Sequence, residues 1–137
     1  MKRKIDLVKL WTKKAENDLI TAEHCLNIKP TPPTDTICFH AQQCAEKYLK
    51  AYLIYKEVEF EKIHDLGDLV SMCATKDPDF KEIYDILKEL TPFAVDVRYP
   101  GVYEEITLEE AHKAVETARK TKEFVIEKLP GEVIKDA

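Results

Sequence analysis

Apolar residues along this chain recur mostly at steps of three and four positions, the spacing that places side chains on one face of an α-helix. Proline-rich or polar stretches interrupt this pattern and divide it into five segments. Only three glycines are present, and long stretches contain no helix breaker. The pattern predicts helices over about residues 6–28, 34–56, 66–75, 77–98 and 107–130.

Each long helix has one apolar stripe that is expected to face a core. Loops of ordinary length join these helices, which is typical of an antiparallel bundle. The predicted fold class is therefore all-α, an antiparallel up-and-down helical bundle of about five helices. The predicted core stripes are Leu7, Leu10, Trp11, Ala15, Leu19, Ala22 and Leu26 in the first helix, Ile37, Ala41, Cys44, Tyr48, Tyr52 and Tyr55 in the second, and Phe80, Ile83, Tyr84, Leu87, Leu90, Ala94 and Val97 in the fourth.

Prolines and capping residues define the expected ends of these helices. A helix cannot continue through proline, and Thr and Asp are favoured just before a first turn. Thr91-Pro92 is expected to kink or restart the fourth helix, and the residues after Pro130 are expected to fray. The expected caps are Thr34 or Asp35 for the second helix, Asp65 for the third, and a capping box of Thr107 and Glu110 for the fifth.

The composition is that of one globular domain. A chain of 137 residues can bury one substantial core, so residues 1–137 are expected to form a single domain with its core over about 6–130. The net charge of −5 argues against a broad nucleic-acid-binding surface but allows a local basic cleft. No signal peptide or apolar run of transmembrane length is found, so a cytoplasmic location without a membrane partner is expected. Abundant lysine and glutamate indicate a thermophile.

The sequence contains no pattern for a metal, a cofactor or a nucleophile. Cys25, Cys38, Cys44 and Cys73 form no Cys-x-x-Cys pair and are expected to be free and buried. No pair of histidines has the spacing of metal ligands, so no metal site is predicted. Three glycines could hardly build a phosphate-binding loop, and the single serine, Ser71, lacks support for a catalytic triad.

Polar residues form a stripe beside the apolar face of the second helix. His40, Gln43, Lys47 and Lys50 recur at steps of three and four, and Glu46 has the spacing to pair with Lys50. His40 either makes a structural hydrogen bond or lines a polar groove together with Lys47 and Arg98. His64 precedes the third helix and could bond a nearby carbonyl there.

The segment Arg98-Tyr99-Pro100-Gly101-Val102-Tyr103 contains one of only three arginines in a chain that uses lysine eighteen times. A planar guanidinium at a helix end suits phosphate or carboxylate recognition. The alternative is an arginine that contacts terminal carbonyls or an interface carboxylate.

Three separated motifs give the chain a family resemblance. The run from Cys38 to Leu53 (CFHAQQCAEKYLKAYL) resembles the second-helix signature of HEPN domains (higher eukaryotes and prokaryotes nucleotide-binding). His64-Asp65-Leu66 resembles the family's step into its third helix, and Arg98-Tyr99-Pro100 falls where that family ends its fourth helix. The resemblance covers roughly residues 9–129 and implies a compact helical bundle that commonly forms a homodimer.

The resemblance also implies a function. Many such proteins are encoded beside a minimal nucleotidyltransferase and form a toxin–antitoxin pair with it. In ribonuclease members, an arginine followed a few residues later by a histidine forms the active site across the dimer interface. Arg98 matches the arginine, but Tyr103, Glu104 and Glu105 stand where the histidine is expected. Histidine exchanges protons near neutral pH, whereas tyrosine and exposed glutamate do so poorly.

We therefore expect a dimer that binds a nucleotide, an RNA or a partner nucleotidyltransferase without strong catalysis. The alternative is a metal-independent endoribonuclease that uses Arg98 with Tyr103 or His40. Tyr99 and Tyr103 could stack on a base or pack in a dimer interface. The nucleotide- or phosphate-binding residues expected on this interpretation are Arg98, Tyr99, His40, Gln43, Lys47 and His64.

Overall fold

The computed structural model describes residues 2–91 and 105–134 of the chain, and all regular structure in these two ranges is helical. The all-α fold class predicted from the sequence is therefore confirmed. No described helix is both long and apolar enough to span a membrane. The helices are α1 (Lys2–Cys25), α2 (Thr34–Tyr55), α3 (Leu66–Ala74), the 3-10 helix η1 (Pro78–Ile83), α4 (Tyr84–Lys88), α5 (Leu108–Glu127) and α6 (Gly131–Ile134).

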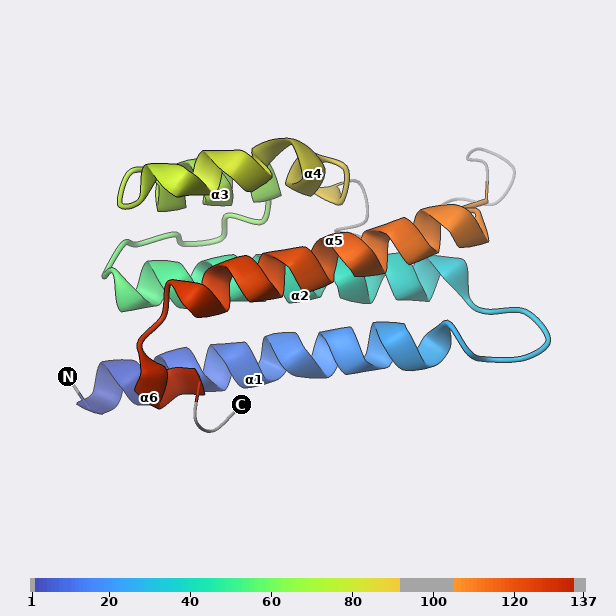
Figure 1. Ribbon diagram of the computed structural model, residues 1–137, viewed down its shortest axis with the longest axis horizontal. Coiled ribbons are helices and arrows are strands. Elements are labelled where there is room, and N and C mark those ends of the chain that lie inside the picture. The colour runs from blue at the N-terminus through green and yellow to red at the C-terminus, as the bar shows by residue number, and fades with distance from the viewer. Residues whose placement is uncertain (1, 92–104, 135–137) are drawn as a thin grey trace.

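Helix α2 lies at the centre of the bundle. It packs against α1 on one side, α5 on another and α3 on a third, and Figure 1 shows α1, α2 and α5 running along the long axis of the molecule. The segment from α3 to α4 covers part of the remaining surface of α2. Because α2 has neighbours on three sides, large side chains such as Tyr48, Tyr52 and Leu49 are almost completely buried on it.

Two of the predicted caps are confirmed. The Asp65 carboxylate accepts a hydrogen bond from the Asp68 amide at 3.0 Å and so begins α3. Thr107 and Glu110 form the complete capping box of α5, with both reciprocal hydrogen bonds at 3.0 Å. The predicted cap of α2 is wrong, because Pro33 occupies that position without a side-chain hydrogen bond and Thr34 is already helical.

The predicted fourth helix is wrong as a single continuous element in the part that the structure describes. Asp77 accepts a hydrogen bond from the Asp79 amide at 3.0 Å, and Pro78 starts a 3-10 helix instead of an α-helix. This tighter winding buries both Phe80 and Ile83. The chain then forms the short helix α4, while the predicted core residues Ala94 and Val97 lie outside the described ranges.

The apolar stripe of α1 is rotated relative to the sequence prediction. Ala15, Leu19 and Ala22 are buried as predicted, but Leu7 and Leu10 are 44 % and 49 % exposed. Val8 takes the buried position instead, because it shares the face that Ala15 and Leu19 turn toward α2. The helix also starts at Lys2 and ends at Cys25, earlier at both ends than the sequence pattern suggested.

The prediction that the chain frays directly after Pro130 is wrong for residues 131–134. These residues form α6, which contacts α1 near the amino-terminal end of the bundle (Figure 1). Val133 is only 3 % exposed, so burial of an apolar side chain fixes this short helix.

Candidate functional site

A band of polar side chains on α2 is held by two nearly buried carboxylates, and we call it the α2 polar band. Its surface members are His40, Gln43 and Lys47, as the sequence pattern predicted. One carboxylate, Asp18, comes from α1, and the other, Glu46, belongs to α2 itself. The members of the band are His40, Gln42, Gln43, Glu46, Lys47 and Lys50, together with Asp18 from α1 and His64 from the segment before α3.

Asp18 joins α1 to α2 through two hydrogen bonds. Its Oδ1 lies 2.8 Å from Nδ1 of His40, and its Oδ2 lies 2.5 Å from Nζ of Lys47. The Asp18 side chain is 11 % exposed, whereas His40 and Lys47 are about one quarter exposed. His40 and Lys47 are therefore brought together through a shared carboxylate, and both keep an accessible edge.

Glu46 is the centre of a second, more deeply buried set of hydrogen bonds. Its Oε2 accepts from Lys50 Nζ at 2.8 Å and contacts His64 Nδ1 at 2.9 Å. Its Oε1 accepts from Gln42 Nε2 at 3.1 Å, and Gln42 in turn accepts from Gln43 at 2.7 Å. Every oxygen of the buried carboxylate thus has a donor, which is what a charge in the interior requires.

Lys50 is directed into the protein and not to the surface. Its ammonium lies 5.8 Å from the centre of the Trp11 ring and 5.4 Å from that of Phe60, and these two rings meet edge to face. Cation–π attraction and the ion pair with Glu46 together compensate for burial of the charge. The sequence pattern places Lys50 in the polar stripe beside the apolar face, but the structure buries its side chain. The predicted pairing of Glu46 with Lys50 is confirmed.

The hydrogen bonds keep Glu46 ionised. Burial by itself would raise the pKa of the Glu46 carboxyl, but the hydrogen bonds from Lys50, His64 and Gln42 outweigh it, and the net shift is downward. A carboxylate that stays charged orients its histidine partner strongly. In a neutral imidazole, Nδ1 then carries the proton and Nε2 is left as an acceptor.

The predicted site residues fall into two groups. His40, Gln43, Lys47 and His64 are brought to the α2 polar band, where each has the partner described above. Arg98, Tyr99 and Tyr103 lie outside the described residues, so their position relative to the band stays a prediction.

Two members of the band, Asp18 and Gln42, were missed by the sequence prediction. A signal for Asp18 was present, because it falls between Ala15 and Ala22 on the buried face of α1. A charge at such a position implies a partner on the neighbouring helix. Gln42 gave no comparable signal, although its side chain is completely buried.

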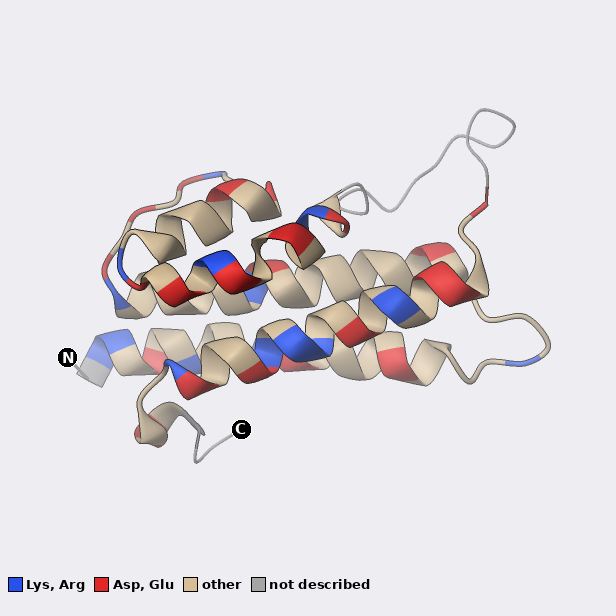
Figure 2. Cartoon of the chain, turned by 45° about the horizontal axis from the view of Figure 1, so that its top comes forward, with Lys and Arg blue, Asp and Glu red and all other residues tan. Residues whose placement is uncertain are grey.

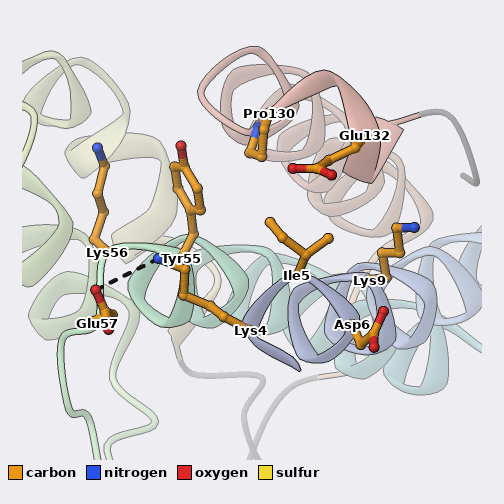
Figure 3. Close-up of a pocket in the computed structure, with 9 residues that line it drawn as sticks. All are labelled: Lys4, Ile5, Asp6, Lys9, Tyr55, Lys56, Glu57, Pro130 and Glu132. Carbon is orange, nitrogen blue, oxygen red and sulfur yellow. Dashed lines mark ion pairs between the residues drawn. The ribbon is translucent and has the colours of Figure 1, made fainter. Parts of the chain in front are cut away.

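An open pocket of about 710 Å³ lies apart from this band, where the first turns of α1, the end of α2 and α6 meet. Figure 3 shows Tyr55 in its wall, with the Lys4 and Lys56 ammonium groups 5.3 and 5.2 Å from the centre of its ring. Lys4 also pairs with Glu57 at 3.7 Å. Opposite charges are balanced in the lining, and none of the predicted site residues that the structure describes contributes to it.

Charge is interspersed along the outer helices. Figure 2 shows acidic and basic positions alternating along α5, where, for example, Glu116 and Lys120 form an ion pair at 3.5 Å. Such a helix offers no basic field for nucleic acid. In the described ranges no group of three or more metal-ligating side chains is found, and no disulfide joins the four cysteines.

These observations define a helical bundle in which two nearly buried carboxylates, Asp18 of α1 and Glu46 of α2, each bond a histidine. The family model of the HEPN domain matches residues 8–129. The chain therefore belongs to the HEPN domain family, as its motifs predicted.

Two solved structures agree with this assignment. An archaeal HEPN homologue, ST0689, is 27 % identical with a TM-score of 0.70, and the match covers 92 % of this chain and 97 % of that one. The protein TT1696 from Thermus thermophilus is also 27 % identical, with a TM-score of 0.75 over 89 % of this chain and 98 % of that one. No curated protein matches the sequence significantly.

Proposed function

We propose that this HEPN protein binds a nucleotide or an RNA as a homodimer and pairs with a minimal nucleotidyltransferase in a toxin–antitoxin-like system. It does so without the usual arginine–histidine pair of ribonucleases. The α2 polar band is the observation that carries the proposal. Buried carboxylates orient its accessible side chains. Ligand recognition requires polar side chains that are held in a fixed orientation where they contact the ligand.

Three side chains of the band would contact a ligand, namely Lys47, His40 and Gln43. Lys47 supplies positive charge near the surface, and His40 and Gln43 lie on the same side of α2. Arg98, in the segment that follows α4 in the sequence, would hold a phosphate. Tyr99 would stack on a base or pack at the dimer interface. The balanced charge along α5 favours this local site over a broad basic face.

The exposed side of α1 supports self-association. Leu7, Leu10 and Ile20 are 44 %, 49 % and 53 % exposed there, and apolar side chains of this size are common in subunit contacts. Light scattering tests this part of the proposal. A species of twice 15.8 kDa is expected at micromolar concentration, and a monomer alone would contradict it.

Binding is tested with a labelled single-stranded RNA by fluorescence anisotropy. Arg98→Ala and Lys47→Met should each weaken binding several-fold, because each removes one positive charge that the proposal assigns to phosphate binding. Lys120→Met is the matched control, since it removes the same charge from the exposed side of α5. Equal loss in all three variants would indicate non-specific attraction and contradict the proposed site.

The alternative function is a metal-independent endoribonuclease that uses Arg98 with Tyr103 or His40. The 2.8 Å contact between Asp18 and His40 favours it specifically, because a carboxylate-bound imidazole can act as a base. RNA cleavage in the presence of a chelator, abolished by Arg98→Ala or His40→Asn, is the expected result for this alternative. RNA that stays intact under these conditions excludes it.

Co-purification of a nucleotidyltransferase encoded beside the chain tests the proposed partner.

A further inference from the structure

His64 combines a buried anchor with an exposed ring. Its Nδ1 lies 2.9 Å from Oε2 of Glu46, a side chain that is only 6 % exposed, while the His64 side chain itself is 64 % exposed. Lys50 and Gln42 fix the same carboxylate from other directions. The imidazole is therefore held by one edge, and the opposite edge, with Nε2, is presented to solvent.

The other histidines of the chain do not share this arrangement. His40 is also bonded to a carboxylate, but it is 27 % exposed and packs edge-on against Phe39. His24 and His112 are exposed on α1 and α5 without a carboxylate partner in the part of the chain that the structure describes. An exposed imidazole in a fixed orientation is consistent with recognition, because a simple surface histidine needs no buried carboxylate to support it.

The orientation determines which ligand groups are complementary. The ionised Glu46 carboxylate accepts a hydrogen bond from Nδ1–H, so Nε2 of the neutral ring is an acceptor. Phosphate oxygens are acceptors as well and do not complement it. A hydroxyl group donates to such a nitrogen, and the 2′-hydroxyl is the group by which a protein distinguishes RNA from DNA.

We infer that His64, positioned by Glu46, accepts a hydrogen bond from a ribose 2′-hydroxyl and makes binding selective for ribonucleotides over deoxyribonucleotides. This rests on the proposed nucleotide or RNA binding and replaces the phosphate contact predicted for His64 from the sequence.

The first arm of the test compares an oligoriboadenylate with the oligodeoxyadenylate of the same length, which differ in the 2′-hydroxyl and not in the base. Anisotropy is measured at alkaline pH, where imidazoles are neutral. The wild-type chain should bind the ribo form about tenfold more tightly, the ratio that one hydrogen bond supports. His64→Asn should bring this ratio close to one, because asparagine has no acceptor at the Nε2 position.

Two further variants separate recognition from structure. His64→Gln places an amide oxygen near the Nε2 position and should restore part of the preference, whereas a merely structural role would not show this rescue. His112→Asn, on the exposed side of α5, is the matched control and should leave the ratio unchanged. Circular dichroism checks that each variant is folded, which the exposure of His64 favours.

The second arm observes the ring directly by two-bond ¹H–¹⁵N correlation spectra of the histidines. The His64 signals, assigned with His64→Asn, should show a protonated Nδ1 and an unprotonated Nε2. Glu46→Gln should change which His64 ring nitrogen carries the proton, and the same variant should lower the preference for the ribo form. Addition of the oligoriboadenylate should shift the Nε2 signal, and the deoxy form should not.

The outcomes distinguish this inference from the proposed function. Equal, Lys47-dependent binding of both oligonucleotides would retain nucleotide binding and overturn the role of His64. Failure of both to bind would overturn both proposals. A His64 ring with a protonated Nε2 in the wild-type chain would overturn the inference independently of any ligand.

Discussion

Lys50 Nζ lies 2.8 Å from Glu46 Oε2, and each of these side chains is only 6 % exposed. The pair therefore places two opposite charges inside the bundle, between α2 and the Trp11 and Phe60 rings. Charges in such a position depend on each other, because the loss of one leaves the other desolvated without compensation.

Lys50→Met should lower the free energy of unfolding by about 3 kcal/mol, since it leaves a buried carboxylate without its cation. Guanidinium titration followed by circular dichroism measures this change. The control is Lys120→Met, which breaks an ion pair of the same helical spacing at an exposed position and should change the free energy by less than about 0.5 kcal/mol. Combining Lys50→Met with Glu46→Gln should recover part of the loss, and a strictly additive double variant would contradict the coupling.

The stability that Glu46 provides should depend on pH in the acid range. The folded-state pKa of Glu46 lies below its ordinary value of 4.5, so the unfolded chain takes up the proton first as the pH falls. The contribution of ionised Glu46 to the free energy of unfolding is therefore complete above pH 4.5. It is lost as the pH falls through the lowered folded-state pKa. The difference in the free energy of unfolding between wild type and Glu46→Gln should shrink as the pH falls below 4.5. A difference that persists unchanged into strong acid would show that Glu46 does not act through its charge.

Thr107→Ala should destabilise the protein by about 1 kcal/mol, because it removes the hydroxyl that accepts from the Glu110 amide. Thermal unfolding provides the measurement. Glu109→Ala alters the first turn of the same helix without touching the capping box, and it should have a much smaller effect. Similar shifts for both variants would mean that the charge of the first turn, not the capping box, stabilises α5.

Glu57→Gly should stabilise the protein by roughly 0.5 kcal/mol, since Glu57 has a φ of 59°, a left-handed conformation that favours glycine. The Val58 amide bonds to the Leu53 carbonyl at 2.9 Å and fixes this end of α2. The ion pair with Lys4 spans 3.7 Å and Glu57 is 79 % exposed, so its loss weighs little. Glu59→Gly, two residues further on, should instead destabilise through the added freedom of the unfolded chain. If both substitutions destabilise the protein, the backbone at Glu57 is not strained by its left-handed conformation.

The thiols should differ in reactivity. Cys38, Cys44 and Cys73 are buried, whereas Cys25 is partly exposed, and burial raises the pKa of the Cys44 and Cys73 thiols. A chromogenic thiol reagent should therefore modify one cysteine in the native protein and all four in denaturant. Cys25→Ser should abolish the native reaction, and a native count above one would indicate that the bundle opens locally.

The sequence predicted the helices and the family well, because helical periodicity and local capping are read from near neighbours. Asp65 and Thr107 cap their helices through residues three positions away, and such signals are local. Leu7 and Leu10 were placed wrongly because the sequence shows an apolar spacing but not which side of α1 meets α2. Only the tertiary arrangement distinguishes these two sides.

The site was predictable only in part for the same reason. His40 and Lys47 share a side of α2, which spacing shows, but the carboxylate that joins them comes from position 18. The burial of Lys50 depends on Trp11 and Phe60, which approach from α1 and from the loop after α2. Contacts of this kind connect distant parts of the chain, so no local pattern records them.

Trp11 gives this arrangement an optical readout. It is the only tryptophan in the chain, and its ring touches Phe60 edge-on while the Lys50 ammonium lies above it. A nearby cation and the exclusion of water both alter indole emission. Intrinsic fluorescence excited at the indole band therefore reports on one place in the molecule, where Trp11 and Phe60 meet beside Lys50, the ion-pair partner of Glu46. A ligand that binds His64 should change the wavelength or the intensity of the Trp11 emission maximum, so no attached dye is needed.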